Sequence, residues 1–386
     1  MKWLRFTHLS AEEPFRALFP LGLALGFLGV LLWPLFFLGG IATYPGIAHA
    51  RLMVEGFVSC FIFGFLATAG PRVLSVPHFK RSEVLRLLLA VPTACALHLG
   101  GAHAFGDAVF LGALLLFVAS LGKRFQQRED SPPPNFALVG LGLLNGIVGA
   151  GLLAFCEASN SAPNLARLAT SLLNLGFLLL PLMGVAPFFL RRLLDLPTED
   201  AGAAGRSQIR EAGKAIAAGL AIDVLFALEI YTTNPALGWA RFGIVALYLG
   251  ITLPMRGNSI LAAGLRLSLT SIVSGLALWA LLPAYRLPVL HIVFIGGFGL
   301  AIFSVATRVI LGHSGNLGLV RRRRAWLIGA LSLILLAMMS RFVADFVPTR
   351  NSHLLWGAIC WLLAAGIWAA IVLPHVGRVE EESLAS

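Results

Sequence analysis

Twelve long apolar runs divide this sequence, and they constrain its fold more than any other feature. Each run is close to the roughly 20 residues that an α-helix needs to cross a bilayer. Lipid admits only helices and closed barrels as spanning structures, and continuous rather than alternating apolar residues predict helices. The runs cover residues 16–40, 49–71, 84–104, 106–122, 136–156, 165–190, 213–231, 239–255, 260–283, 289–311, 325–343 and 353–374. We therefore expect an all-α polytopic membrane protein with about twelve transmembrane helices.

The composition of the chain supports this fold class. Hydrophobic residues make up 58% of the 386 residues and charged residues only 12%, and the mean hydropathy is +0.86. These values exclude an ordinary soluble domain. The four cysteines stand singly, without a Cys-x-x-Cys pair, so the sequence indicates neither a disulfide framework nor a zinc knuckle. No triad, phosphate-binding loop or dinucleotide fingerprint occurs in a plausible context, so no catalytic residue is identified.

The basic residues predict the orientation of the chain in the membrane. Most of the 29 lysines and arginines fall in alternate connections, which places them on one side of the bilayer. By the positive-inside rule this side is the cytoplasm, and both termini lie there. The net charge of +11 is then a topology signal that favours contact with anionic headgroups and requires no nucleic acid.

The connections between the runs contain no sign of a soluble domain. We expect a single transmembrane domain over residues 1–386. The longest cytoplasmic connection, residues 191–212, contains "LPTEDAGAAGRS", which is typical of a polar linker. A division into six-plus-six halves around this linker is the alternative organisation, as in transporters built from two halves.

Histidines gather at the expected outer ends of the helices, and they indicate a ligand-binding site there. Five of the nine are His49, His98, His103, His291 and His353, with His98 and His103 expected near the outer end of the third helix. His49 and Met53 are four residues apart and so share a helix face. Imidazole and thioether are ligands for haem iron or Cu(I). The alternative is structural, with the methionine as packing and the histidines bonded to headgroups or water.

The stretch "HIVFIGGFGLAIFSVATRVILGHSGN" carries a histidine at each end of one expected span. At about 1.5 Å per residue, His291 and His313 lie roughly 33 Å apart, so one metal ion cannot bind both. Arg308 is expected near the inner boundary of the hydrocarbon. We predict that it is a structural clamp with His313 as its neighbour at the helix end, and the alternative is simple snorkelling to the headgroups.

Other ionisable residues are expected inside the membrane, where each is costly unless it is paired. They are Asp223, Glu229, Arg266, Arg308 and Arg341. An ion pair of Asp223 or Glu229 with Arg266 is one arrangement. A polar cavity or a cofactor propionate facing these groups is the other.

Three segments resemble the NnrS family, bacterial twelve-span membrane proteins linked to nitric oxide stress and denitrification and described as carrying haem and copper. The segments are "PFRALFPLGLALGFLGVLLW", "HARLMVEGFVSCFIFGFLATAGP" and the stretch from His291 to Asn316. The most specific parts are the Gly-Phe-Leu-x-Thr-Ala run at 64–69 and the Thr-Arg-x-x-Leu-Gly-His run at 307–313. The resemblance implies a place in the bacterial inner membrane.

The departures from the family pattern concern the ligands. The usual His-Ala-His-Glu-Met appears here as His49, Ala50, Arg51, Leu52 and Met53. An arginine cannot ligate iron or copper. The resemblance therefore implies that this chain either lacks one metal or recruits another group, such as His98 or His353.

Two functions stay open at the level of sequence. In the favoured one, the protein binds haem, with copper as a further candidate, and senses or relieves nitric oxide stress. Outer histidines, His49 and His291 first among them, ligate the metal, and Arg51, Arg266 or Arg308 holds the propionates. In the alternative, it transports a small molecule or metal ion through a cavity lined by Asp223, Glu229 and the arginines.

Overall fold

A computed structural model describes most of the chain, and every regular element in the described part is helical. The described residues are 12–159, 163–193, 206–232, 234–253, 259–322 and 324–378. Both ends of the chain, His8, and residues 194–205 of the expected linker at 191–212 lie outside them.

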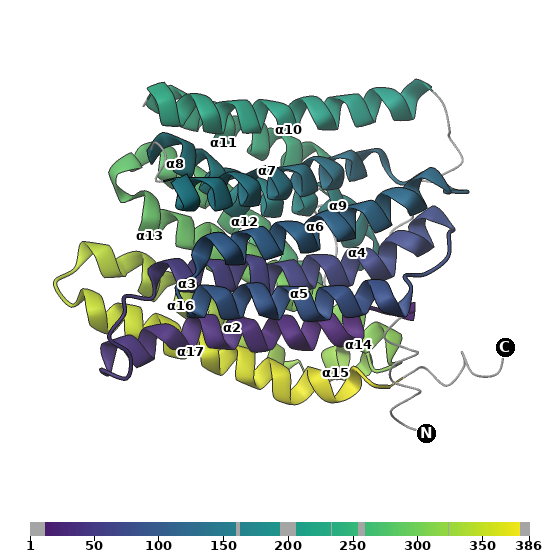
Figure 1. Ribbon diagram of the computed structural model, residues 1–386. Helices are drawn as coiled ribbons and strands as arrows, with labels where there is room; N and C mark the ends of the chain where they lie inside the picture. The colour runs from purple at the N-terminus through teal and green to yellow at the C-terminus, as the bar shows by residue number, and fades with distance from the viewer. Residues whose placement is uncertain are drawn as a thin grey trace. The chain divides into compact units, whose positions relative to one another are not determined.

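The helices follow one another closely along the chain (Figure 1), with α and η marking α-helical and other helical elements respectively. The first half contains α2 (Phe15–Phe37), α3 (Gly46–Arg51), η1 (Leu52–Val58), α4 (Ser59–Leu74), α5 (Arg81–Leu99), α6 (His103–Gln126), η2 (Pro134–Phe136), α7 (Ala137–Ser159), α8 (Pro163–Ser171), η3 (Leu172–Gly176) and α9 (Phe177–Leu193). The second half contains α10 (Arg206–Thr232), α11 (Pro235–Thr252), α12 (Ile260–Leu281), η4 (Pro283–Tyr285), α13 (Arg286–His291), η5 (Ile292–Gly299), α14 (Leu300–His313), α15 (Gly318–Arg322), α16 (Ala325–Val343), η6 (Ala344–Phe346), α17 (Arg350–Val372) and η7 (Leu373–His375).

Twelve continuous helical stretches in the described residues are long and apolar enough to span a membrane, so the predicted count is confirmed. The predicted boundary between the third and fourth spans, at residue 105, is wrong. The chain breaks at 100–102, where Gly101 adopts a φ of +79° that ends the helix. His103 therefore begins α6 rather than ending the preceding helix. The orientation of the chain stays a prediction.

Three of the spans contain a π-helical segment, in which the backbone bonds skip one residue further than in an α-helix. These segments are η1, η3 and η5. The spans that contain them are also the longest, at 29, 31 and 31 residues, and the most buried. Such segments are rare and often occur at functional sites.

The helices form two compact units, each described here by itself. The first unit comprises Met1–Leu21 and Val54–Met255, and the second comprises Gly22–Met53 and Arg256–Ser386. The division falls within α2, between Leu21 and Gly22, and within the span Gly46–Leu74, between Met53 and Val54. The single transmembrane domain and the alternative division into six-plus-six halves both stay predictions.

Within the first unit, α5, α6 and α7 lie side by side (Figure 1), and glycines on α7 bring its neighbours close. A Cβ on Gly149 would stand 2.7 Å from the backbone nitrogen of Leu173 in η3, and one on Gly146 would stand 2.8 Å from the Phe177 ring. Gly142 abuts the ring of Pro181. Small residues three and four apart thus let helices approach without a hydrophobic driving force.

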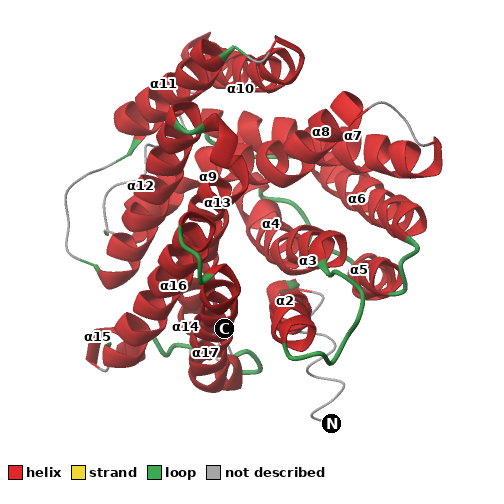
Figure 2. Ribbon diagram, turned by 90° about the vertical axis from the view of Figure 1, so that its left-hand side faces the viewer, coloured by secondary structure: helices red, strands yellow, loops and turns green. Residues whose placement is uncertain are grey.

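Within the second unit, α12 packs directly on η5, and α16 pairs with α17 (Figure 2). Ser268 donates a hydrogen bond of 2.7 Å to the carbonyl oxygen of Gly297. The indole nitrogen of Trp368 donates to the hydroxyl of Thr307 over 2.8 Å. Buried polar side chains in this unit therefore bond across helices, as lipid requires.

Candidate functional site

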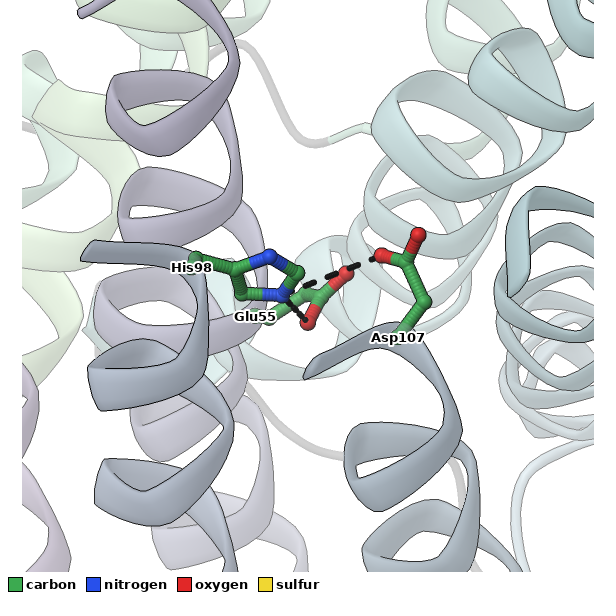
Figure 3. Close-up of side chains that lie close together, drawn as sticks. All are labelled: Glu55, His98 and Asp107. Atoms are coloured by element: carbon green, nitrogen blue, oxygen red, sulfur yellow. Dashed lines mark hydrogen bonds and ion pairs between the residues drawn. The ribbon is translucent and has the colours of Figure 1, made fainter. Parts of the chain in front are cut away.

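A buried cluster of three ionisable side chains lies in the first unit (Figure 3), and we call it the His98 cluster: Glu55, His98 and Asp107. Their residue exposures are 0%, 1% and 0% respectively. His98 Nε2 lies 3.0 Å from Glu55 Oε2 and 3.8 Å from Asp107 Oδ1. One ligand atom from each residue falls within 4.8 Å of the others. The group therefore has the residue types and the spacing of a metal site.

Each member of the His98 cluster comes from a different helix. Glu55 lies in η1, His98 in the last turn of α5, and Asp107 in the second turn of α6. The short turn at 100–102 folds α6 back against α5. Gly106 makes room for the imidazole, because a Cβ there would stand 2.5 Å from His98 Cε1.

A second imidazole orients His98. His98 Nδ1 lies 3.3 Å from His103 Nδ1, and the two rings stack with centroids 5.6 Å apart and an interplanar angle of 22°. Since a carboxylate only accepts, His98 Nε2 donates to Glu55. In the neutral ring Nδ1 is then an acceptor, and His103 donates to it. His98, which the sequence places among the outer histidines, therefore contacts Glu55, Asp107 and His103.

His49 belongs to the second unit, and a backbone carbonyl group orients its imidazole ring. Its Nδ1 lies 2.9 Å from the carbonyl oxygen of Gly29, which must be the acceptor, so Nδ1 carries the proton and Nε2 keeps its lone pair. Trp33 contacts the ring edge to face, with centroids 5.7 Å apart. Met53 also lies against Gly29, because a Cβ there would stand 3.3 Å from its sulfur. His49 and Met53 therefore both lie beside Gly29.

His291 repeats this arrangement on another helix of the second unit. Its Nδ1 lies 2.8 Å from the carbonyl oxygen of Leu287, so its Nε2 also keeps a lone pair. His49, His291 and Arg341 lie within range of electrostatic interaction. His49 precedes η1 by three residues and His291 directly precedes η5. Both residues are of intermediate exposure.

The other predicted ligand, His353, lies at the start of α17. Ser340 donates 2.8 Å to its carbonyl oxygen and lies 3.4 Å from its Nδ1. Arg51 is buried in the last turn of α3, with 5% exposure. Their predicted roles as haem or propionate ligands stay predictions.

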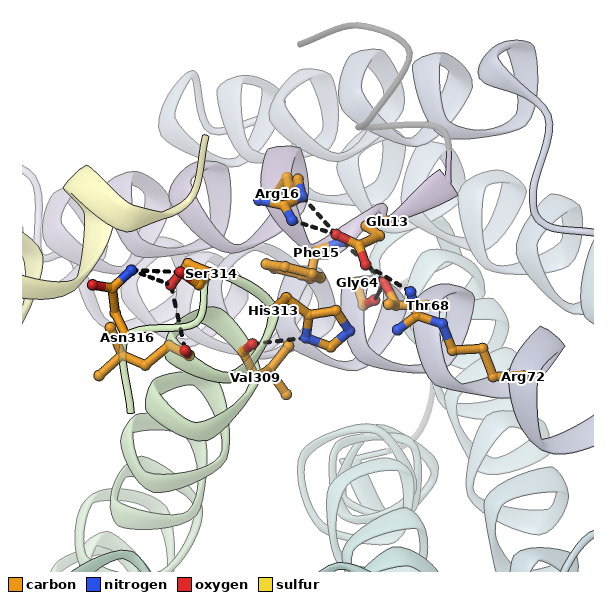
Figure 4. A network of polar contacts seen from close by, with 11 residues as sticks. Glu13, Phe15, Arg16, Gly64, Thr68, Arg72, Val309, His313, Ser314 and Asn316 are labelled. Carbon is orange, nitrogen blue, oxygen red and sulfur yellow. Dashed lines mark hydrogen bonds and ion pairs between the residues drawn. The ribbon is translucent and has the colours of Figure 1, made fainter. Parts of the chain in front are cut away.

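The helix end near Arg308 has the packing expected of a structural position. A Cβ on Gly312 would stand 2.5 Å from Arg308 Nη1, so the guanidinium lies over the last turn of α14. His313 Nδ1 donates over 2.8 Å to the Val309 carbonyl (Figure 4). This bond is local, and the clamp itself stays a prediction.

The intramembrane carboxylates of α10 have partners that the sequence does not suggest. Glu229 forms an ion pair with Arg241 of α11, and Arg241 is fully buried and lies over the Phe226 ring. Asp223 accepts a hydrogen bond of 2.8 Å from Asn145. Arg266, the expected partner, belongs to the second unit. Partners within the first unit favour a structural role for these carboxylates over a transport cavity.

The Gly-Phe-Leu-x-Thr-Ala run holds the start of α2 in place (Figure 4). Thr68 Oγ1 accepts from the Phe15 backbone N–H at 3.2 Å and donates to the Gly64 carbonyl at 2.7 Å. A Cβ on Gly64 would stand 3.1 Å from Phe15 Cα. Beside them, Glu13 bonds to both Arg16 and Arg72, at 2.7 and 2.6 Å. The motif is therefore a packing and capping device.

Two members of the His98 cluster were missed by sequence reasoning as site residues. Neither Glu55 nor Asp107 has a site role in the sequence analysis. Each is an isolated carboxylate inside an apolar run, and such a residue is itself a signal of function.

Twelve membrane-length helices in the part of the chain that the structure describes, with ionisable side chains buried among them, define a polytopic helical membrane protein. The family model described as NnrS protein matches residues 10–379, so the chain belongs to the NnrS family. No curated protein matches the chain.

Proposed function

We propose that this protein binds haem through His49 and His291 and acts in the bacterial response to nitric oxide or nitrosative stress. The observation that carries the proposal is the matched pair of imidazoles in the second unit. Each donates its Nδ1 proton to a backbone carbonyl, and the two are within electrostatic range of each other. Family membership supports the physiological role.

The donor chemistry of this pair fits haem. A ligating histidine usually donates its other ring N–H to a carbonyl or carboxylate, which fixes the tautomer and the ring plane. Each Nε2 keeps its lone pair for a metal, because the proton of each ring is on Nδ1. Arg341 is a further candidate for binding a haem propionate, besides Arg51, Arg266 and Arg308. It also donates a hydrogen bond of 2.8 Å to Asp345. When bound, haem supplies an iron that takes diatomic ligands or electrons.

The residues near His49 do not form an adequate copper site. His49 and Met53 offer two ligands, and Arg51 stands where the family pattern has a further histidine. Arginine stays protonated and has no lone pair to donate. The proposal therefore concerns haem alone.

The role of the chain's own residues is orientation. The Gly29 carbonyl directs the His49 ring and the Leu287 carbonyl directs the His291 ring. Each bond raises the basicity of the opposite nitrogen, which strengthens a metal bond there. A π-helical segment follows each histidine along the chain. It shifts the helix face on which later side chains lie, relative to the face of the histidine.

The test is haem content in the detergent-purified protein, measured by optical spectra and by extraction. His49→Ala and His291→Ala are each expected to lose most of the bound haem. The control is His78→Ala, because His78 is exposed in the connection between α4 and α5. Wild-type protein without haem, or equal haem in all three variants, would contradict the proposal.

A further inference from the structure

We propose that Glu55, His98 and Asp107 bind a divalent first-row metal ion of the Mn²⁺, Fe²⁺ or Zn²⁺ class. This site uses none of the residues assigned to haem, and it does not rest on the proposed function. The three residues lie within the first unit, on η1, α5 and α6.

The geometry is close to that of a loaded site. Metal ligands at about 2.0 to 2.2 Å from an ion stand about 3.0 to 3.5 Å from one another. The observed separations of His98 Nε2 from Glu55 Oε2 and Asp107 Oδ1 are 3.0 and 3.8 Å. Small side-chain rotations suffice to seat an ion between the three atoms. In doing so the His98 ring changes tautomer: its proton moves from Nε2 to Nδ1, which donates to His103 Nδ1, and His103 keeps its own proton on Nε2. The Nε2 lone pair of His98 then binds the metal with no net loss of a proton.

The donor set selects the class of ion. Two carboxylates and one imidazole offer oxygen and nitrogen ligands, a mixture that suits Mn²⁺, Fe²⁺ and Zn²⁺. The imidazole disfavours Mg²⁺ and Ca²⁺, which take oxygen ligands. The cluster has no thiolate or thioether to favour Cu(I). Two carboxylates also balance the charge of a divalent ion in a place where water is excluded.

The surroundings of His98 are those of a supported ligand. His103 stacks on it and contacts the nitrogen that faces away from the carboxylates, as second-layer partners of metal-ligating histidines do. Gly106 confines the ring from another side. An imidazole held at both its nitrogen and its edge has little freedom to turn away from an ion.

A purely structural role predicts a different result. A histidine between carboxylates also joins three helices as a buried ion pair. Such a pair has no need of an ion, and it would leave the purified protein free of stoichiometric metal.

The experiment uses the full-length protein in detergent, stripped with a chelator and then equilibrated with Mn²⁺ or Zn²⁺ at micromolar concentration. We expect about one ion per chain. Asp107→Asn and Glu55→Gln preserve side-chain size, and each is expected to weaken binding by at least about tenfold. Asp223→Asn is the matched control, because it removes another partly buried carboxylate of the first unit.

Three outcomes would overturn the proposal: no stoichiometric Mn²⁺ or Zn²⁺ in wild-type protein, binding of Cu²⁺ alone, or unchanged binding in Asp107→Asn. If the variants do not fold, pulsed EPR of Mn²⁺-loaded wild-type protein decides, since coupling to one imidazole nitrogen is expected and its absence refutes the site. His49→Ala should keep this metal, which distinguishes failure here from failure of the haem proposal.

Discussion

Replacement of Arg124 by lysine tests whether a residue that resembles a topology signal is in fact a structural clamp. Arg124 lies in the last turn of α6 and is only 7% exposed. Its guanidinium makes five hydrogen bonds, two to the Glu83 carboxylate at 3.1 and 2.8 Å and three to the carbonyls of Pro77, His78 and Ser120 at 3.1, 2.8 and 2.9 Å. It thus joins α6, the start of α5 and the connection before it.

The expected loss follows from the number of donors. A lysine ammonium has three N–H groups at one point, so it reaches at most three of the five acceptors. Two lost bonds to a charged donor amount to roughly 3 kcal/mol, at about 1.5 kcal/mol each. The Glu83 side chain is 16% exposed, so water compensates part of this loss. We expect Arg124→Lys to lower the free energy of unfolding by about 2 to 3 kcal/mol, or about 30- to 150-fold in the equilibrium constant.

The assay is unfolding in mixed micelles as the fraction of denaturing detergent rises, followed by tryptophan fluorescence. Arg128→Lys is the matched control, because Arg128 is exposed and donates 2.8 Å to the Phe125 carbonyl. Its effect should stay within about 0.5 kcal/mol. Equal stability of the two variants would refute the claim that the planar fork of Arg124 holds this end of the unit, since both substitutions keep the positive charge.

Two further predictions concern topology and packing. A reporter inserted near Ser131 should report the cytoplasm, because the flanking connection carries basic residues, and a periplasmic signal would contradict the proposed orientation. Gly149→Ala should lower thermal stability in detergent by about 1 to 3 kcal/mol through overpacking, since the added methyl meets backbone at 2.7 Å. Gly140→Ala, where nothing lies within 4 Å of an added Cβ, should leave stability unchanged or raise it, and equal losses in both variants would count against the packing argument.

The fold was predictable because hydrocarbon imposes one rule on every span. The apolar runs give the number of helices and their approximate ends, without knowledge of which helices touch. The break before His103 was misplaced because hydropathy continues through Gly100 and Gly101, and only the left-handed conformation of Gly101 ends the helix there. Apolar content records burial in lipid, whereas helix ends depend on local backbone geometry.

The sites were only partly predictable, because they depend on rotation about the helix axes. His49 and His291 stand out as ionisable residues at the ends of spans. Nothing in the sequence shows that Glu55 turns toward His98 in the next span. A spacing of four residues marks one face only in an α-helix, and residues 52–58 are π-helical. The sequence also does not show which residues Glu229 and Asp223 contact, because those contacts depend on rotation about the helix axes as well.

The location of the His98 cluster has a consequence for how the protein is made. Glu55, His98 and Asp107 all belong to the second, third and fourth spans. A span that enters the bilayer with an ionised carboxylate in hydrocarbon is penalised by about 3 kcal/mol until a partner arrives. Here the partners are in the two spans synthesised next, so the ribosome has to supply only four helices before the cluster is complete. The three cluster residues are therefore able to come together in the membrane while the rest of the chain is still being translated.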